Sequence, residues 1–317
     1  MGILVNGQWQ DKWYDTASEG GHFKRQDSIF RHWITPEGPF QPESGRYHLY
    51  VSMACPWAHR TLIFRQLKQL SQHISVSVVN PDMLENGWEF EGGSDSEFQD
   101  HLYQSHFVYE LYTRALPDYT GRVTVPILWD KKTQTIVNNE SSEIIRMFNS
   151  AFNNLTGDTK DYYPESHRHS IDEINHRVYH SINNGVYKCG FATTQQAYEE
   201  AFEALFDSLD WIEEQLAQQP YLAGAEITEA DWRLFTTLVR FDSVYVGHFK
   251  TNKRTIMSYE NIWSYLKALY QQSGIAETVS MEQIKRHYYF SHKMINPTQI
   301  IPKGPEIDFM ESHNRQT

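Results

Sequence analysis

The chain has 317 residues, which is long enough for two compact domains that each bury a core. Hydrophobic residues make up 40% of the sequence and aromatic residues 14%, a composition typical of a globular protein and not of a disordered one. The formal net charge is −12 and no run of basic residues occurs, which argues against nucleic acids and anionic membranes as partners.

Targeting and membrane-spanning segments are not indicated by the sequence. Residues 1–7 carry no basic residue and are too short for the apolar part of a signal peptide. No apolar run approaches the length of a transmembrane helix. We therefore expect a soluble, cytoplasmic protein that does not bind membranes.

Residues 1–45 have weak periodicity and are rich in glycine, polar and aromatic residues. We predict that they form an irregular arm that packs on the body of the protein. Free disorder is not expected, because the arm carries the aromatic residues Trp9, Trp13, Phe23, Phe30 and Trp33.

Residues 46–150 show the pattern of a thioredoxin-like domain, in which strand, helix and strand are followed by a hairpin and a helix. The strands are predicted at 46–51, 74–79, 125–130 and 135–137, and the helices from Pro56 to about 70 and from Ser141 onwards. The segment 81–122 is longer than an ordinary connection and is predicted to be an insertion, which at this length is often functional.

Cys55 lies where the first of these strands should meet its helix, and no other position in the sequence is as informative. Pro56 suits the first helical position, where its missing N–H has no partner to lose. The helix dipole and the unpaired N–H groups at this end favour a thiolate, so we expect a lowered pKa for Cys55. An isolated cysteine is more often a small buried hydrophobic residue, but this context favours a reactive thiol.

The only other cysteine is Cys189. Two cysteines in dissimilar contexts do not support a disulfide framework and suit a reducing compartment. Ala58 stands three residues after Cys55, so this motif cannot run a thioredoxin-type dithiol cycle. A second thiol would come from Cys189 or, in better agreement with the sequence, from a small molecule.

Residues 165–295 are predicted to form an all-helical domain. An amphipathic face extends from Tyr198 to Leu216, and a further helix starts at Thr228, which forms a capping-box pattern with Asp231. Further segments are predicted at 262–270 (helix), 281–289 (helix) and 296–317 (an extended tail interrupted by prolines).

A thioredoxin-like half followed by a helical half, with Val125-Pro126 and then Glu140-Ser141, resembles a glutathione transferase. Longer motifs make the resemblance more specific: Cys55-Pro56-Trp57-Ala58, Asn86-Gly87-Trp88, Arg122 to Pro126, Asn183 to Lys188, and His287-Tyr288-Tyr289 leading to Asn296-Pro297. Together these motifs are similar to those of the Xi class, the glutathionyl-hydroquinone reductases, over nearly the whole chain.

The resemblance implies the glutathione transferase fold, with an α/β N-terminal thioredoxin-like domain and an all-α C-terminal domain. It also implies glutathione as co-substrate and a homodimer. Cys55 would attack the sulfur of a glutathionyl-hydroquinone, release the hydroquinone and keep glutathione as a mixed disulfide. A second glutathione would then regenerate the thiolate and leave as glutathione disulfide.

The resemblance also assigns the residues that bind glutathione. Val125, before a proline whose peptide bond is cis in this family, would hydrogen-bond the cysteinyl backbone of glutathione. Ser141 would bind the γ-glutamyl carboxylate and Glu140 the ammonium, unless a serine only caps the helix and Glu140 is a solvated charge. Trp88 would contact glutathione through its indole and Arg122 through its charge, with a core tryptophan and a surface ion pair as the alternatives.

Tyr187 and Tyr288 match the phenols that the family places beside the hydroquinone, where they could protonate or hydrogen-bond the departing oxygen. Tyr289 is a weaker third candidate. Because the chain has 19 tyrosines, any one of them is more often part of the core than catalytic. Cys189, close to Tyr187 in the sequence, is predicted to be a bystander.

The 15 histidines do not form a metal-binding pattern. Neither His167 with His169 nor His101 with His106 has the ligand spacing of a zinc site, so no metal is expected, and no nucleotide is implied. His59, four residues after Cys55, could modulate the thiolate, although an exposed histidine on the helix surface is the favoured interpretation.

Three functions of different classes remain open. The first is glutathione-dependent reduction of glutathionyl-hydroquinones. The second is a conjugating glutathione transferase, or a general thiol transferase or dehydroascorbate reductase; conjugation normally uses a Tyr or Ser, so Cys55 argues against it. The third is a non-catalytic binding module, because a fold alone does not establish activity.

Overall fold

The computed structural model describes residues 2–91 and 97–315. The chain divides into two compact units that are each assembled from separate stretches of sequence. The first unit comprises Met1–Trp13, Gln26–Lys160 and Thr278–His292, and the second comprises Tyr14–Arg25, Asp161–Glu277 and Lys293–Thr317. The domain boundaries expected from the sequence stay a prediction.

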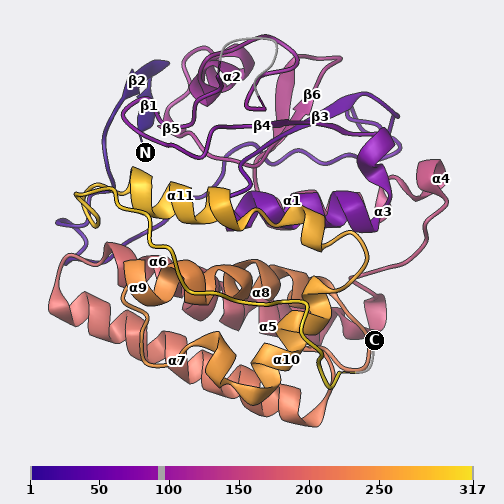
Figure 1. The fold of residues 1–317 in the computed structure, drawn as a ribbon. Helices are drawn as coiled ribbons and strands as arrows, with labels where there is room; N and C mark the ends of the chain where they lie inside the picture. The colour runs from indigo at the N-terminus through magenta and orange to yellow at the C-terminus, as the bar shows by residue number, and fades with distance from the viewer. Residues whose placement is uncertain (1, 92–96, 316–317) are drawn as a thin grey trace. The chain divides into compact units, whose positions relative to one another are not determined.

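A four-stranded mixed sheet lies at the centre of the first unit (Figure 1). Its strands are β3 Tyr47–Val51, β4 Ser75–Val78, β6 Ile127–Asp130 and β7 Thr135–Asn138, in the order β4-β3-β6-β7. Strand β3 is parallel to β4 and antiparallel to β6, and β6 pairs with β7 as the predicted hairpin. The predicted strand–helix–strand unit and the hairpin that follows it are confirmed.

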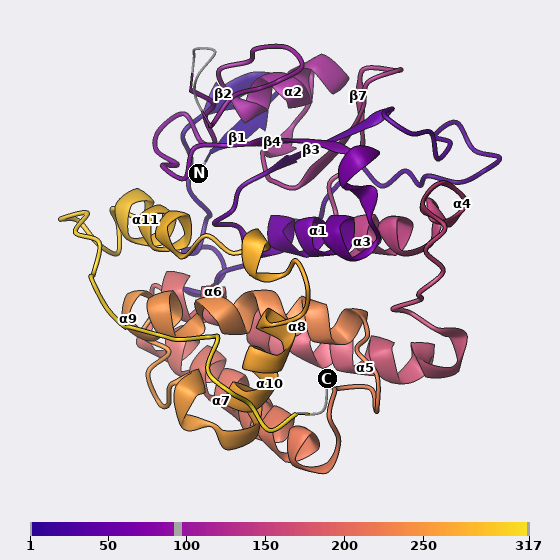
Figure 2. The same cartoon turned by 45° about the vertical axis from the view of Figure 1, so that its right-hand side comes forward.

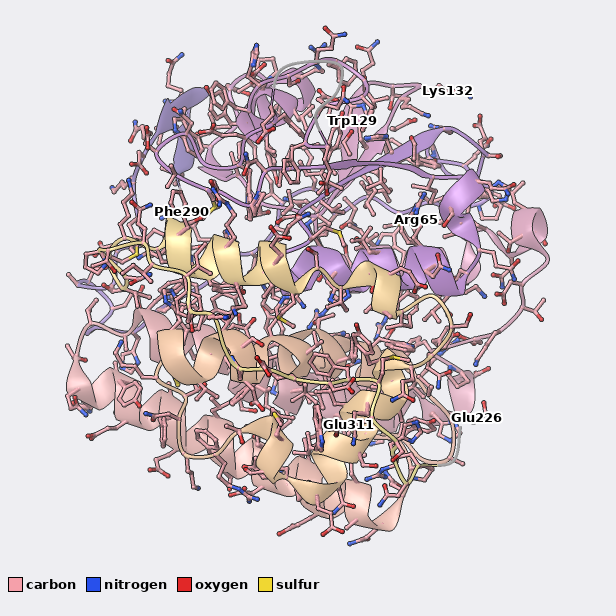
Figure 3. The ribbon with its side chains drawn as sticks, viewed as in Figure 1. Arg65, Trp129, Lys132, Glu226, Phe290 and Glu311 are labelled. Carbon is pink, nitrogen blue, oxygen red and sulfur yellow. The ribbon has the colours of Figure 1, made fainter. Side chains whose placement is uncertain are left out.

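Helices cover both faces of this sheet. The helices of the first unit are α1 Pro56–Leu67, α2 Val108–Ala115, α3 Ser141–Ser150, the short α4 Asn153–Thr156, which buries no residue, and α11 Met281–Ser291. Figures 1 and 2 show α1 and α3 on one side of the sheet and α2 on the other. Trp129 of β6, labelled in Figure 3, is fully buried, and its indole donates to the Tyr103 hydroxyl over 3.0 Å.

A second, three-stranded antiparallel sheet has the order β2-β1-β5. Its strands are β1 Ile3–Val5, β2 Gln8–Gln10 and β5 Gly121–Arg122. The prediction of an irregular arm is therefore wrong for residues 3–10. The missed signal is Asn6-Gly7, which takes the two positive φ angles, 48° and 74°, that a tight hairpin turn requires.

The second unit is helical. Its helices are α5 Arg168–Val178, α6 Gly185–Phe191, α7 Gln195–Gln218, α8 Glu229–Arg240, α9 Val246–His248 and α10 Glu260–Tyr270, with π-helical turns at Tyr179–Asn183 and Phe241–Tyr245. The capping box predicted at the start of α8 is confirmed, because the Thr228 N–H and hydroxyl donate to Asp231 Oδ2 over 2.7 and 3.0 Å. The strongly polar α5 lies within the range predicted to be helical but was not identified as a separate helix, since its apolar positions are few.

The C-terminal tail runs along the second unit without helix or strand as far as residue 315. Phe309 stacks on Tyr270, with 4.8 Å between the ring centroids, and Arg315 donates to the Gln219 carbonyl over 2.9 Å. Among the helices of the described residues, none is both long and apolar enough to cross a membrane.

Candidate active site

Cys55 occupies the junction between β3 and α1 that the sequence predicts. It is the N-cap residue of α1, with φ −76° and ψ 119°, and Pro56 fills the first helical position. The Cys55 carbonyl accepts a hydrogen bond from the N–H of His59 over 3.0 Å. The N–H groups of the first turn have no acceptor within the helix, so this end carries positive character, which favours a thiolate.

The Cys55 sulfur lies beside the backbone of Val125. Sγ is 3.6 Å from the Val125 carbonyl oxygen, and both residues are buried. The Val125–Pro126 peptide bond is cis, as the family resemblance implies. The first unit therefore brings the predicted nucleophile next to the predicted main-chain contact for glutathione.

Glu140 caps the N-terminus of α3. Its Oε1 accepts hydrogen bonds from the Ser142 N–H at 3.0 Å and from the Ser142 hydroxyl at 2.9 Å. The Ser141 hydroxyl is 3.5 Å from the same oxygen and accepts from Arg60 Nη1 over 3.4 Å. The alternative interpretation, in which a serine caps the helix and Glu140 is a solvated charge, is therefore wrong, because the glutamate is the cap.

The residue before Glu140 is held by two separate segments. The Asn139 N–H donates to the Phe30 carbonyl over 3.1 Å, and the Phe30 N–H donates to Asn139 Oδ1 over 3.3 Å. The Asn139 amide also donates to the hydroxyl of Tyr112 in α2 over 3.1 Å. These bonds fix the path of the backbone into α3, and thereby the direction of its first N–H groups.

Arg122 and Trp88 lie in the same unit as Cys55. The Arg122 guanidinium donates to the carbonyls of Lys12 and Trp13, the latter over 2.9 Å. Trp88 is only 5% exposed and stacks on His287, with 4.8 Å between ring centroids. Arg122 thus holds backbone carbonyls of the N-terminal region, and Trp88 contacts α11.

Tyr288 belongs to α11 and, at 1% exposure, is almost fully buried. Its ring meets His287 edge-on at 5.2 Å and His292 at 5.5 Å between centroids. Tyr289, the weaker candidate, is half-buried. The structure places Tyr288 with Cys55 in the first unit, whereas Tyr187 belongs to the second.

Tyr187 lies on α6 within an aromatic cluster of the second unit. Its ring neighbours are Phe23, Phe191, Tyr245 and Phe249, at centroid distances of 5.6 to 6.3 Å. The Arg25 guanidinium lies 5.2 Å from the centroid of the Tyr187 ring, and Arg25 Nε donates to Asn184 Oδ1 over 3.0 Å. Sequence reasoning missed Arg25, because nothing in the local pattern links it to α6.

Cys189 is buried in the second unit, with 2% of its surface exposed. Burial in apolar surroundings raises the pKa of its thiol to about 12. Neither cysteine forms a disulfide. A buried thiol of this kind is inert near neutral pH, which supports the interpretation of Cys189 as a bystander.

The expectation of an exposed His59 is wrong. His59 is fully buried, and its Nε2 lies 2.8 Å from the hydroxyl oxygen of Thr278. The helical spacing placed it correctly on the helix of Cys55, but gave no sign of the segment that covers it. Within residues 2–91 and 97–315, no group of three His, Cys, Asp or Glu side chains could hold a metal ion.

Two family models match the chain. The Glutathione S-transferase N-terminal domain matches residues 54–151, and the Glutathione S-transferase C-terminal domain matches residues 195–268. Glutathionyl-hydroquinone reductase YqjG of Escherichia coli is 56% identical, with 99% of this chain and 98% of that protein covered. The chain therefore belongs to the glutathione transferase family.

Solved structures identify the class more closely. The glutathione-bound structure of YqjG superimposes with a TM-score of 0.90 at 52% identity and covers 99% of each chain. A Xi-class transferase from Natrialba magadii gives a TM-score of 0.92 at 48% identity, with 99% of this chain and 96% of that chain covered. The resemblance to the Xi class and the predicted fold class are confirmed.

Proposed function

We propose that this chain catalyses the glutathione-dependent reduction of glutathionyl-hydroquinones to hydroquinones. The observation that carries the proposal is the position of Cys55, which caps α1 beside the Val125 carbonyl. A relative with 56% identity over nearly the whole chain bears the name of that reductase. A thiol at this place supports disulfide chemistry, because a hydroxyl could stabilise a glutathione thiolate but could not form the covalent adduct.

In the first half-reaction, the Cys55 thiolate attacks the sulfur that joins glutathione to the ring. An S–S bond forms while the C–S bond breaks, the electron pair of the broken bond passes to the ring, and a proton takes the place of sulfur on the ring carbon. The products are the hydroquinone and a Cys55–glutathione mixed disulfide. In the second half-reaction, a glutathione thiolate attacks this disulfide, releases glutathione disulfide and restores the Cys55 thiolate.

Glutathione is bound, in this proposal, between Val125 and the start of α3. The backbone of Val125 pairs with the cysteinyl part, and Ser141 with the first N–H groups of α3 receives the γ-glutamyl carboxylate. The buried Arg60 guanidinium, which donates to the Ser141 hydroxyl, adds positive charge close to that carboxylate. Glu140 pairs with the γ-glutamyl ammonium while it caps the helix.

The other residues have, in this proposal, the roles that the family resemblance implies. Trp88 contacts glutathione through its indole and Arg122 through its charge. Tyr187 and Tyr288 donate to the hydroquinone oxygens, since a phenol with a pKa of about 10 is matched to a quinolate. The Arg25 guanidinium over the Tyr187 ring places a positive charge beside this proposed donor.

The test is intact-protein mass spectrometry on the reduced chain. Mixing with a synthetic glutathionyl-hydroquinone should add one glutathione and release hydroquinone, and excess glutathione should remove the adduct. Cys55→Ala should form no adduct and lose turnover, whereas the matched control Cys189→Ala should retain most activity. Turnover retained in Cys55→Ala would refute the mechanism.

The same experiment separates the other functions left open by the sequence. Thioether formation with an electrophile in wild type, without any adduct, would indicate a conjugating transferase. Failure to form either product would indicate a binding module. Cys55→Ser should show weak conjugation, because its hydroxyl can donate to a glutathione thiolate.

We also propose that the protein works as a homodimer in the cytoplasm. Its reduced cysteines suit a reducing compartment where glutathione is abundant. Sedimentation of the purified chain would test the dimer, and fractionation of cells that express it would test the location.

A further inference from the structure

Hydrogen bonds join α11 to residues 81–83, although the two segments lie far apart in the sequence. Arg286 makes a two-pronged ion pair with Asp82, at 2.7 and 2.6 Å. Ser291 Oγ accepts from the Met83 N–H over 2.9 Å. Between them, His287 Nδ1 lies 2.8 Å from the Pro81 carbonyl oxygen. All of these residues belong to the first unit.

His287 also contacts two residues of the candidate site. Its ring stacks on Trp88 at 4.8 Å with 17° between the planes, and it meets Tyr288 edge-on at 5.2 Å with 77° between the planes. His287, Trp88 and Tyr288 are 6%, 5% and 1% exposed, so all three rings are buried. Phe290 on the same helix, labelled in Figure 3, instead meets the guanidinium of Arg286 at 5.0 Å.

We propose that His287 is a positioning residue that couples the glutathione side of the active site to the hydroquinone side. It holds the Trp88 indole with the face of its ring and the Tyr288 phenol with its edge, while its Nδ1–H fixes the ring to the Pro81 carbonyl. Movement of one aromatic ring is thereby transmitted to the other. The inference rests on the proposed function, because Trp88 and Tyr288 receive their roles there.

The chemistry of the contacts requires the two properties that histidine combines. A carbonyl oxygen only accepts, so the ring must carry its proton on Nδ1. Stacking on an indole requires a flat ring. Asparagine could offer an N–H near the place of Nδ1 but has no ring, and phenylalanine offers the ring without a donor. His287→Asn therefore removes the stacked ring and keeps the donor, whereas His287→Phe keeps the ring and removes the donor.

A second histidine, His292, connects the rings of His287 and Tyr288 to the segment that Arg122 contacts. His292 lies 5.5 Å from both the His287 and the Tyr288 ring centroids and 6.2 Å from that of Trp13. The Trp13 carbonyl accepts from Arg122 Nη2 over 2.9 Å. Two of the residues proposed to contact glutathione are thus connected to Tyr288. Trp88 is connected through the His287 ring, and Arg122 through the Trp13 carbonyl and the rings of Trp13 and His292.

The first experiment measures binding without chemistry. S-methylglutathione, which lacks a thiol, is titrated calorimetrically into full-length wild type, His287→Asn, His287→Phe and His287→Ala. We expect the Kd to rise about three- to tenfold in His287→Ala, with smaller rises in the other two, since Trp88 loses its support. His176→Asn, which changes a ring pair in the second unit, is the matched control and should leave the Kd unchanged.

The second experiment measures coupling in the first half-reaction. Adduct formation on Cys55 is followed by quenched-flow mass spectrometry for Trp88→Phe, Tyr288→Phe and the double variant, each with His287 and with His287→Ala. With His287 present, the rate of the double variant should differ by about threefold or more from the rate expected by multiplying the effects of the two single substitutions. In the His287→Ala background, the two effects should simply multiply. A merely structural histidine would lower Tm without changing this relation.

The two proposals fail separately. If wild type forms no adduct, the proposed function fails, and the binding titration alone then decides whether His287 supports Trp88. If wild type is active but the folded His287 variants keep the wild-type Kd, or if the Trp88 and Tyr288 effects already multiply in the presence of His287, the positioning role is overturned. Should His287→Ala not fold, His287→Asn and His287→Phe carry the same comparison.

Discussion

Treatment of the folded protein with iodoacetamide at pH 7 is expected to modify Cys55 far faster than Cys189. Cys55 stands at the N-terminal end of α1, where positive character favours the reactive thiolate. Cys189 is buried, and its surroundings disfavour a charged sulfur. The two side chains therefore provide an internal comparison within one molecule.

The size of the difference follows from the pKa of Cys189. At pH 7 a thiol with a pKa of about 12 is ionised to about one part in 10⁵, against about 3% for an ordinary thiol with a pKa of about 8.5, a ratio of about 3,000. A more basic thiolate is the better nucleophile, and with a Brønsted slope of about 0.45 the Cys189 thiolate is about 40-fold more reactive than the thiolate of an ordinary thiol. Cys189 should thus react about 80-fold more slowly than an ordinary thiol, and its 2% exposure slows it further.

The assay follows the two cysteine-containing peptides by mass spectrometry after quenching at successive times. Glutathione in the same tube serves as the ordinary thiol, and the protein unfolded in guanidinium shows the rates without the fold. In the unfolded protein, the two cysteines should react at similar rates. If Cys189 in the folded protein reacts within about threefold of glutathione, the assignment of a strongly raised pKa is refuted.

Three further predictions concern stability and turnover. Burial lowers the pKa of His48 from 6.5 to about 3, so between these values only the unfolded state takes up the proton. The free energy of unfolding should therefore decrease as the pH is lowered, by at most about 3 kcal/mol between pH 7 and pH 4 in urea unfolding, and more steeply than in His48→Asn. Arg25→Met should lower kcat/KM about two- to fivefold, because the cation over the Tyr187 ring is lost, and Arg25→Lys should give a value between those of Arg25→Met and wild type. Equal kcat/KM values for wild type and both variants in steady-state kinetics would contradict this. Glu140→Ala should lower Tm by about 2–4 °C through loss of the cap of α3 and also raise the KM for glutathione, and a wild-type KM would argue against the ammonium contact.

Local patterns in the sequence were sufficient to predict the strand–helix junction at which Cys55 lies. Alternating apolar residues predict β3, helical spacing predicts α1, and the proline after the cysteine places the boundary between them. The capping box of Thr228 and Asp231 was likewise visible, because both partners lie within one helical turn. In each case the physical cause of the structure acts between residues that are close along the chain.

Contacts between distant segments could not be predicted in this way. The burial of His59 depends on Thr278, which lies 219 residues further on. Arg25 reaches Asn184 across 159 residues, and His287 reaches Pro81 across 206. Neither hydrophobic periodicity nor a capping motif indicates such distant partners, so these contacts emerge only from the fold. The proposed nucleophile, in contrast, was predicted from its neighbours in the sequence.

The absence of a second reactive thiol in the chain determines how the proposed cycle must end. Ala58 stands where a dithiol enzyme would carry its second cysteine, and Cys189, the only other one, has a pKa raised to about 12 by burial. The mixed disulfide on Cys55 must therefore be cleared by a thiol from solution, and its decay should be proportional to the glutathione concentration at low concentration. Adduct freed of small thiols should persist, and Cys189→Ala should not change its decay. Release of glutathione without added thiol, with a Cys55–Cys189 disulfide detected by mass spectrometry, would show instead that the chain resolves its own intermediate.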